Sequence, residues 1–345
     1  MDSARLPILD QHQRKLRKLR ISVTDRCNLR CQYCMPEREY DWLPKADRLT
    51  FAEIESVAGA LVSLGVDAIR LTGGEPLLRR DLSSLVRSLA ALPGLQDVAM
   101  TTNGILLADQ ARDLRAAGLQ RITLSLDTLH ADRFRQLTGQ DRLQQVLSGF
   151  AAARDAGFVE VKSNAVVMQG INDDELGALA RLAFEHGIEP RFIEYMDVAG
   201  ATGWRPAAVL GREDILARLE AELGPLTPTD SDPSAPARRY ATAQGQTLGI
   251  IASTTTPFCG ACTRLRLTAD GHLYTCLYGK HGHNLREELR AGLVGEALRE
   301  RLAGIWQART DRGAEERLAA PERGAWLDRD TLRQNPHLEM HTKGG

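Results

Sequence analysis

Short β-like runs alternate with amphipathic helical segments over roughly the first 200 residues of the chain. Each helical segment ends near a glycine, and the first begins with Thr50 followed three residues later by Glu53, a capping-box pattern. Strands separated by helices favour a parallel sheet with crossover helices on its faces. The expected strands are Arg20–Thr24, Ala68–Thr72, Asp97–Thr101, Arg121–Leu126, Glu160–Val167 and Arg191–Tyr195.

The number of these units leaves two architectures open. About six strand–helix units build either an open barrel or a doubly wound sheet. After Gly200 the pattern changes, and Asp230–Arg238 is rich in Pro, Ser and Asp, which predicts a loop. The segment Arg264–Leu277 alternates polar and apolar residues around Asp270-Gly271, which predicts a β-hairpin. The C-terminal part is therefore expected to be smaller and less regular.

The charge balance argues against large charged partners. Lys and Arg total 44 and Asp and Glu total 45, so no net field attracts nucleic acid or a membrane surface. The chain shows no apolar run of membrane-spanning length and no signal peptide, and six cysteines are too few for a disulfide scaffold. We therefore expect a cytoplasmic protein with reduced thiols. The basic cluster from Arg14 to Arg20 is expected to be mostly a solvated arm.

Three cysteines, Cys27, Cys31 and Cys34, follow the first expected strand with the spacing C-x3-C-x2-C. Thiolates hold iron–sulfur cubanes, and a full set is four. A trio leaves one iron without a protein ligand, and an open metal position can hold a chelating substrate. Structural zinc takes four protein ligands, and no fourth Cys or His lies nearby in the sequence. The trio therefore predicts a catalytic iron–sulfur cluster.

A second trio, Cys259, Cys262 and Cys276, lies in the C-terminal part. His272 stands between its last two cysteines, so a zinc site with three Cys and one His is chemically reasonable. From spacing alone, zinc and an iron–sulfur cluster stay equally open at this second position.

Polar and small residues follow several of the expected strands. Gly73 and Gly74 follow the second strand, Thr101 ends the third, Ser125 lies at the end of the fourth, and Met196 follows the sixth. Ligands of barrels and open α/β sheets bind at the carboxyl ends of the strands. Paired glycines also allow a backbone to approach a ligand closely. We therefore expect a binding site at this edge of the sheet.

Basic residues within strands point to an anionic ligand. Arg264 and Arg266 are two residues apart on a strand and share one face, where they could grip a phosphate or carboxylate. The alternative is an exposed polar face of a hairpin. Arg70 and Lys162 lie among apolar strand residues, and burying them requires either an anionic ligand or a neighbouring carboxylate such as Glu160.

The cysteine loop with Tyr33 before its last cysteine resembles the radical S-adenosylmethionine superfamily. Further segments are similar to the GTP 3′,8-cyclases, and this resemblance extends from about Arg20 to the end of the chain. The segments are RLTGGEP at residues 70–76, NAVV at 164–167, GIND at 170–173, RFIEYMDV at 191–198, the second trio with its two arginines, and the terminal Gly344-Gly345.

The resemblance implies an α/β fold, an incomplete (β/α)6 TIM-like barrel with a smaller C-terminal α+β domain carrying a second 4Fe–4S cluster. It divides the chain into a basic arm at 1–19, a radical domain at 20–200 and an auxiliary-cluster domain with a Gly-Gly tail at 201–345. It implies a lyase that cyclises GTP to (8S)-3′,8-cyclo-7,8-dihydroguanosine 5′-triphosphate, the first step of molybdenum cofactor biosynthesis. In that reaction a 5′-deoxyadenosyl radical abstracts the ribose 3′ hydrogen. A low-potential electron donor and a homodimer are expected as well.

The resemblance also assigns residues to roles. Arg264 and Arg266 would aid the final reduction as well as bind GTP. Two departures from the family pattern, Thr263 and Gln140, put local hydrogen bonding in doubt rather than the reaction. The six cysteines would bind two 4Fe–4S clusters. Tyr33, Gly74, Ser125 and Met196 would contact S-adenosylmethionine, and Arg20, Arg70, Thr101, Lys162, Arg264, Leu265 and Arg266 would hold GTP.

Two other functions remain as alternatives. One is a radical enzyme with an auxiliary cluster that modifies a peptide, which would not explain five basic residues in one cavity. The other is a non-enzymatic metal-binding or redox-sensing protein, which would not need the strand-end residues. For the Gly344-Gly345 end we expect entry into the cavity, where its carboxylate or amides would position Arg266, because glycines can thread a narrow channel.

Overall fold

The N-terminal part of the chain contributes six parallel strands, which form the middle of the sheet in their order along the chain. The computed structural model describes residues 7–229, 232 and 234–344. The alternation of strands and helices is confirmed, and the strand ends differ from the expected ones by at most two residues. The strands are β1 (Lys18–Ser22), β2 (Ala68–Thr72), β3 (Asp97–Thr102), β4 (Arg121–Ser125), β5 (Glu160–Val167) and β6 (Glu189–Glu194), each parallel to the next.

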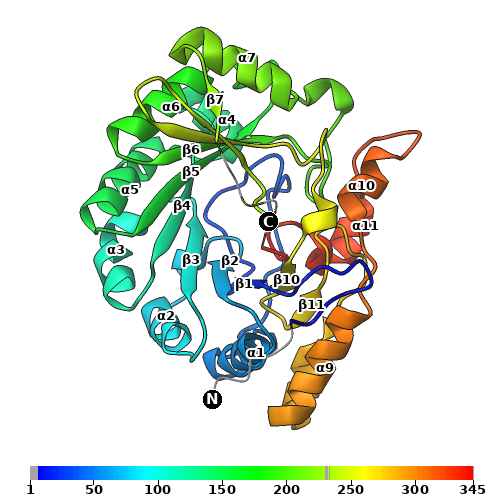
Figure 1. The fold of residues 1–345 in the computed structure, drawn as a ribbon. Coiled ribbons are helices and arrows are strands. Elements are labelled where there is room, and N and C mark those ends of the chain that lie inside the picture. The colour runs from blue at the N-terminus through cyan, green and yellow to red at the C-terminus, as the bar shows by residue number, and fades with distance from the viewer. Residues whose placement is uncertain (1–6, 230–231, 233, 345) are drawn as a thin grey trace.

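Helices connect these strands and lie outside the curved sheet, as Figure 1 shows. The capping box at Thr50 is confirmed: its hydroxyl accepts a hydrogen bond from the Glu53 amide at 3.2 Å, and the Glu53 carboxylate accepts one from the Thr50 amide at 2.7 Å. Fully buried side chains such as Leu61 and Leu85 pack the helices onto the sheet. The helices are α1 (Phe51–Ser63), α2 (Leu82–Ala90), α3 (Leu107–Ala116), α4 (Ala131–Thr138), α5 (Leu143–Asp155) and α6 (Leu176–Glu185).

The C-terminal part extends the same sheet on both sides. β10 (Arg264–Leu267) pairs in parallel with β1, and β9 (Thr247–Ile251) pairs in parallel with β6. The sheet stays open, because its order runs from β12 at one edge to β7 at the other. The remaining strands are β7 (Thr227–Pro228), β8 (Arg238–Ala241), β11 (His272–Tyr274) and β12 (His283–Asn284).

The expected hairpin is present, since β10 and β11 pair antiparallel with Leu267 opposite Leu273. Gly271 in the turn has a φ of +85°, a conformation that favours glycine. The expected loop at 230–238 ends at β8, and residues 230, 231 and 233 lie outside the described ranges.

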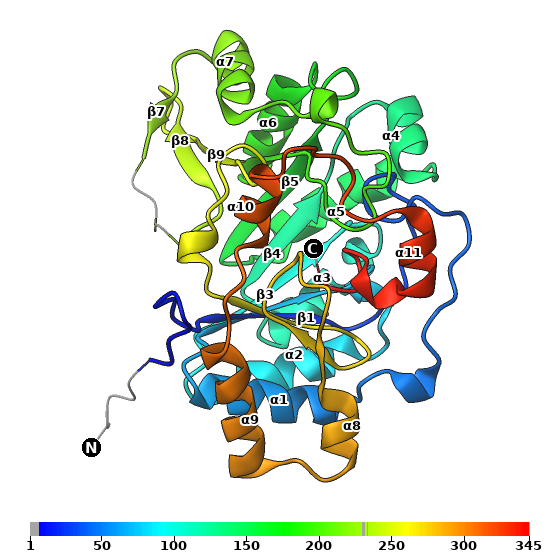
Figure 2. The same ribbon diagram turned by 90° about the vertical axis from the view of Figure 1, so that its right-hand side faces the viewer.

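Helices of the C-terminal part cover one side of the molecule. Figure 2 shows α9 beside α1, and the two helices are in contact. None of the helices in the described ranges combines the length and hydropathy that crossing a membrane requires. The helices on this side are α8 (Leu285–Arg290), α9 (Gly295–Gln307), α10 (Gly313–Leu318) and α11 (Arg329–Gln334), whereas α7 (Arg212–Leu223) packs against α6. Short 3-10 turns occupy Lys45–Asp47, Pro76–Leu78, Pro206–Ala208, Cys259–Ala261 and Pro336–Leu338.

The basic N-terminal segment is more integrated than a solvated arm. Arg14 is buried, forms an ion pair with Asp10 at 2.5 Å and donates to the carbonyl of Cys259 at 3.0 Å. Arg17 remains partly exposed beside Asp67 at 2.7 Å. The segment therefore packs against the loop that carries the second cysteine trio.

Candidate functional site

A cavity of about 630 Å³ lies along the parallel strands, and its lining extends from Lys18 and Ala68 at their amino ends to Gly74 and Met196 beyond their carboxyl ends. It brings together every site residue expected from the sequence except Leu265. Both cysteine trios reach it, although they are more than 220 residues apart in the chain. The expected residues lining it are Arg20, Cys27, Cys31, Tyr33, Cys34, Arg70, Gly74, Thr101, Ser125, Lys162, Met196, Cys259, Cys262, Arg264, Arg266 and Cys276.

Leu265 has a different location. Its side chain is completely buried in the hydrophobic core, in register with Leu19 of β1. Arg264 and Arg266 on either side of it line the cavity, as alternation along a strand requires.

The paired glycines after β2 support the first cysteine loop. A Cβ on Gly73 would lie 2.4 Å from the Thr24 carbonyl oxygen, and a Cβ on Gly74 would lie 2.3 Å from the Arg26 carbonyl oxygen. The Gly74 amide donates to the Thr24 oxygen at 3.0 Å. The glycines thus let the segment leading to Cys27 lie directly on the end of β2. The sequence predicted only that these glycines allow a ligand to approach the backbone.

The first trio has the donor chemistry that an iron–sulfur cluster requires. Burial raises the pKa of Cys27 to about 11 and raises the pKa values of Cys31 and Cys34 well above their usual value, so iron would supply the charge that stabilises the thiolates. Within the described part of the chain, no three Cys, His, Asp or Glu side chains form a group that could hold a single metal ion. Cubane ligands need no such convergence, because each thiolate binds a different iron.

The second trio lies beside cationic side chains. Burial acts to raise the pKa of Cys262, but the nearby guanidinium groups of Arg264 and Arg309 outweigh it and lower the pKa to about 6. Arg309 also donates to the Cys262 carbonyl at 2.9 Å. His272 is engaged elsewhere: its Nδ1 lies 3.0 Å from the Asp270 carboxylate. The zinc arrangement with His272 is therefore not assembled among the described residues.

Three arginines lie side by side across neighbouring strands. Arg20 on β1 is in register with Arg70 on β2 and with Arg266 on β10. Burial, and then mutual repulsion, holds the pKa of Arg20 well below its usual value, and burial lowers the pKa values of Arg70 and Arg266 to about 10. This cavity wall would be stabilised by an anion with several charges.

The other basic residues have different partners. Lys162 forms an ion pair with Glu160, as the alternative from the sequence proposed. Its pKa is nevertheless lowered to about 8, by burial and by nearby Arg191. Arg70 donates to the hydroxyls of Thr101 at 3.1 Å and Thr123 at 3.0 Å, which leaves its charge available to a ligand.

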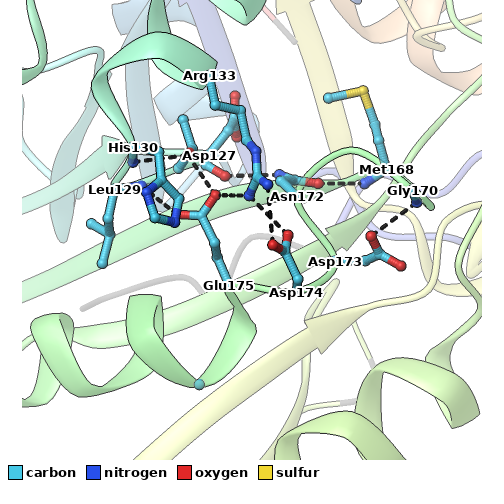
Figure 3. Close-up of polar contacts among 12 residues, drawn as sticks. Asp127, Leu129, His130, Arg133, Met168, Gly170, Asn172, Asp173, Asp174 and Glu175 are labelled. Atoms are coloured by element: carbon cyan, nitrogen blue, oxygen red, sulfur yellow. Dashed lines mark hydrogen bonds and ion pairs between the residues drawn. The ribbon is translucent and has the colours of Figure 1, made fainter.

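A polar network fixes Tyr33 in the first cysteine loop. The Tyr33 hydroxyl donates to the Asp127 carboxylate at 2.6 Å, and burial raises the pKa of Asp127 to about 6. The Asn172 amide donates to the Asp127 carbonyl at 2.8 Å and accepts from the Met168 amide at 2.8 Å, as Figure 3 shows. The GIND segment therefore anchors the ends of β4 and β5 behind the cysteine loop.

The end of the chain reaches the arginines. The Gly344 carbonyl accepts hydrogen bonds from Arg266 at 2.7 Å and from Arg20 at 3.0 Å, while Gly345 lies outside the described residues. Gly344 has a φ of +67°, and a Cβ there would lie 2.3 Å from the Thr72 side chain. Lys343 is buried over the Tyr274 ring and donates to the Gly279 carbonyl at 2.6 Å.

Sequence reasoning missed further charged residues of the cavity. Arg121, Arg191 and Arg309 line it as well. Arg191 and Ile193 share the cavity face of β6 while Phe192 between them is buried in the core, and this alternation could have identified Arg191. Arg309 follows α9, where no local pattern relates it to the site.

The comparisons with known proteins agree with this geometry. Residues 21–183 match the radical SAM superfamily model and residues 188–315 match the Molybdenum Cofactor Synthesis C model. The chain is 49% identical to GTP 3′,8-cyclase 1 of Mycobacterium tuberculosis, over 99% of this chain and 97% of the relative. It is 45% identical to GTP 3′,8-cyclase of Xanthomonas campestris, over 100% and 99%.

A solved structure shares the fold. The crystal structure of Streptococcus suis SuiB bound to S-adenosylmethionine superposes with a TM-score of 0.59 at 18% identity, covering 92% of this chain and 77% of that chain. At this identity the likeness concerns the fold alone.

Proposed function

The chain belongs to the family of GTP 3′,8-cyclases, and from this premise we propose how its cavity carries out the reaction. It is a radical S-adenosylmethionine enzyme that cyclises GTP in the first step of molybdenum cofactor biosynthesis. The residue assignments rest on one observation: two cysteine trios and a row of three arginines line the same cavity.

In this proposal the two trios hold separate 4Fe–4S clusters. When bound, the first cluster supplies the low-potential electron that cleaves S-adenosylmethionine to methionine and a 5′-deoxyadenosyl radical. The chain orients S-adenosylmethionine through Tyr33, Gly74, Ser125 and Met196. Asp127 and the glycines after β2 hold the first cysteine loop, which carries Tyr33, in place.

The basic wall binds the substrate. Arg20, Arg70 and Arg266 take the triphosphate, whose charge compensates for their burial and for the repulsion from neighbouring guanidinium groups, the two causes that lower their pKa values. Lys162, Thr101 and Arg264 complete the GTP contacts, and Arg264 and Arg266 aid the final reduction, whereas Leu265 is left out because it is buried and does not line the cavity. A peptide would leave these charges uncompensated, which favours a polyanionic substrate.

The architecture proposed for this site is the incomplete (β/α)6 barrel of residues 20–200, closed by residues 201–345 with the arm at 1–19. The pairing of β9 and β10 supports the proposed closure by residues 201–345, because β9 pairs with β6 at one edge of the six-stranded set and β10 pairs with β1 at the other. A homodimer and an external electron donor complete the proposal.

Two serine variants test the two-cluster assignment. After anaerobic reconstitution, we expect about eight irons per chain in the natural protein and about four in both Cys34→Ser and Cys276→Ser. Cys34→Ser should form no 5′-deoxyadenosine, whereas Cys276→Ser should retain uncoupled cleavage without cyclisation. Stoichiometric zinc at the second trio, or equal loss of cleavage in both variants, would contradict the assignment.

A further inference from the structure

Asp197 stands directly after Met196, beyond the end of β6, and its side chain is completely buried. Met196 and Val198 line the cavity, whereas Asp197 does not. Its carboxylate points to three side chains from distant parts of the chain. They are Tyr278, whose hydroxyl lies 2.9 Å away, Arg317, whose Nε lies 2.8 Å away, and Arg323, whose Nη2 lies 3.0 Å away.

The carboxylate of Asp197 is anionic. Burial acts to raise its pKa, but hydrogen bonds from Arg323 and Arg317 outweigh burial and keep the pKa below the usual value. Two guanidinium groups and a phenol therefore compensate one buried charge. Removing such a charge leaves its partners buried without their acceptor, which is costly.

Two of the three partners, Tyr278 and Arg317, belong to segments that lie beside Cys276 of the second trio. Tyr278 lies two residues after Cys276. Arg317 belongs to α10, whose first residue, Gly313, is pressed against the same loop: a Cβ there would lie 2.6 Å from the Tyr278 Cβ and 3.0 Å from the Cys276 Sγ. Asp197 thus fastens both the loop and the helix that enclose Cys276.

Arg323 also contacts two other segments that lie near the end of β6. Its Nη1 donates to the Thr254 carbonyl at 3.0 Å, and its guanidinium lies 5.2 Å from the centre of the Trp204 ring. The segment from α10 to Arg323 is therefore held at three points around the end of β6.

We propose that Asp197 is a positioning residue that holds the Cys276 loop in register with Met196, so that the radical formed at one trio meets a substrate held at the other. This inference rests on the proposed roles of Met196 and Cys276. It predicts that loss of the Asp197 charge separates cleavage of S-adenosylmethionine from consumption of GTP.

The test compares Asp197→Asn with a matched control, Glu175→Gln. Glu175 is also a buried carboxylate paired with an arginine, Arg133, and it accepts from the Leu129 amide at 2.7 Å, but it does not line the cavity (Figure 3). Both variants are reconstituted anaerobically. The readouts are iron per chain, electron paramagnetic resonance spectra with and without GTP, thermal midpoint, and 5′-deoxyadenosine formed per GTP consumed.

For Asp197→Asn we expect cleavage to persist while the ratio of 5′-deoxyadenosine to GTP consumed rises about tenfold, the effect of losing one charged hydrogen bond. In the natural protein we expect GTP to change the spectrum of the second cluster because the substrate lies against it, and Asp197→Asn should lose this change. Glu175→Gln should keep the ratio and the spectral change of the natural protein. Tyr278→Phe, which removes one hydrogen bond and no charge, should show a smaller shift in the same direction.

Unchanged coupling in folded Asp197→Asn, or in Tyr278→Phe if Asp197→Asn does not fold, would overturn the proposal. Equal uncoupling in Glu175→Gln at the same loss of thermal midpoint would overturn it too, because general destabilisation would then suffice. A natural protein with only four irons would overturn the two-cluster assignment itself, whereas eight irons with unchanged coupling in the variants would overturn only the role of Asp197.

Discussion

Arg20, Arg70 and Arg266 form a row of charges that lies across three strands. Burial lowers the pKa values of all three, and repulsion from neighbouring guanidinium groups adds to it. A triphosphate relieves this repulsion by adding negative charge where guanidinium forks can bind bidentately. We therefore propose that the wall serves to bind a ligand with several negative charges.

Arg266 tests this interpretation of the wall. A charged hydrogen bond contributes roughly 1.5–3 kcal/mol, so Arg266→Ala should weaken GTP binding about tenfold or more. Equilibrium binding of GTP, with S-adenosylmethionine binding measured alongside, checks the prediction. Arg115→Ala on the exposed side of α3 is the control, and it should bind both ligands like the natural protein. Unchanged GTP affinity in Arg266→Ala would remove this arginine from the substrate site.

Lys162 gives the site a pH dependence. Burial lowers its pKa to about 8, so the free enzyme loses this charge as the pH rises above 8. GTP favours the charged form, so binding takes up a proton and affinity should fall by up to about tenfold per pH unit above 8. Binding measured from pH 7.5 to 9.5 in the natural protein and in Lys162→Arg checks this prediction. Identical slopes would mean that Lys162 does not face the phosphates, since arginine keeps its charge throughout.

At the scale of elements, the strands carry the arginine row, and loops and the chain end hold these residues and the strand ends in place. Gly73 and Gly74 allow the first cysteine loop to rest on β2, and the GIND segment holds the neighbouring strand ends. The tail approaches from the far end of the sequence and contacts the arginine row through Gly344. Its position depends on the absence of side chains, because a Cβ on Gly344 would collide with Thr72.

Deletion of Gly344 and Gly345 should lower cyclisation sharply while both clusters and S-adenosylmethionine binding persist. The physical reason is the loss of the carbonyl that holds Arg266 and Arg20, since misplacement by about 1 Å can cost 100-fold in rate. Single-turnover rates with GTP, together with iron content, measure the effect, and Gly344→Ala should show a comparable defect through the collision with Thr72. A truncated protein that turns over at the full rate would contradict a positioning role for the tail.

At the scale of the whole molecule, local patterns predicted the elements but not all of their neighbours. The capping box at Thr50 and the turn at Gly271 depend on a few adjacent residues, and both were predictable. The alternation also placed Arg264 and Arg266 on one face. The parallel pairing of β10 with β1 was not predictable from periodicity, because it joins segments about 240 residues apart.

Buried polar partners were equally hidden from the sequence. Asp127 lies two residues after the end of β4, yet its bond to Tyr33 depends on how the cysteine loop folds back onto β4. Arg309 and Asp197 carry no local pattern, and only the tertiary structure relates them to the second trio. The resemblance to a family supplied the site residues that physical patterns left open, such as Ser125 and Met196.

The central claim is that radical formation at one trio serves chemistry on GTP in the same cavity. The most direct measurement is anaerobic incubation of the reconstituted protein with S-adenosylmethionine, dithionite and GTP, following 5′-deoxyadenosine and GTP together. We expect 5′-deoxyadenosine to appear in step with the loss of GTP, and little loss of GTP when S-adenosylmethionine is omitted. If the protein with both iron–sulfur clusters reconstituted cleaves S-adenosylmethionine but leaves GTP unchanged, the account is contradicted.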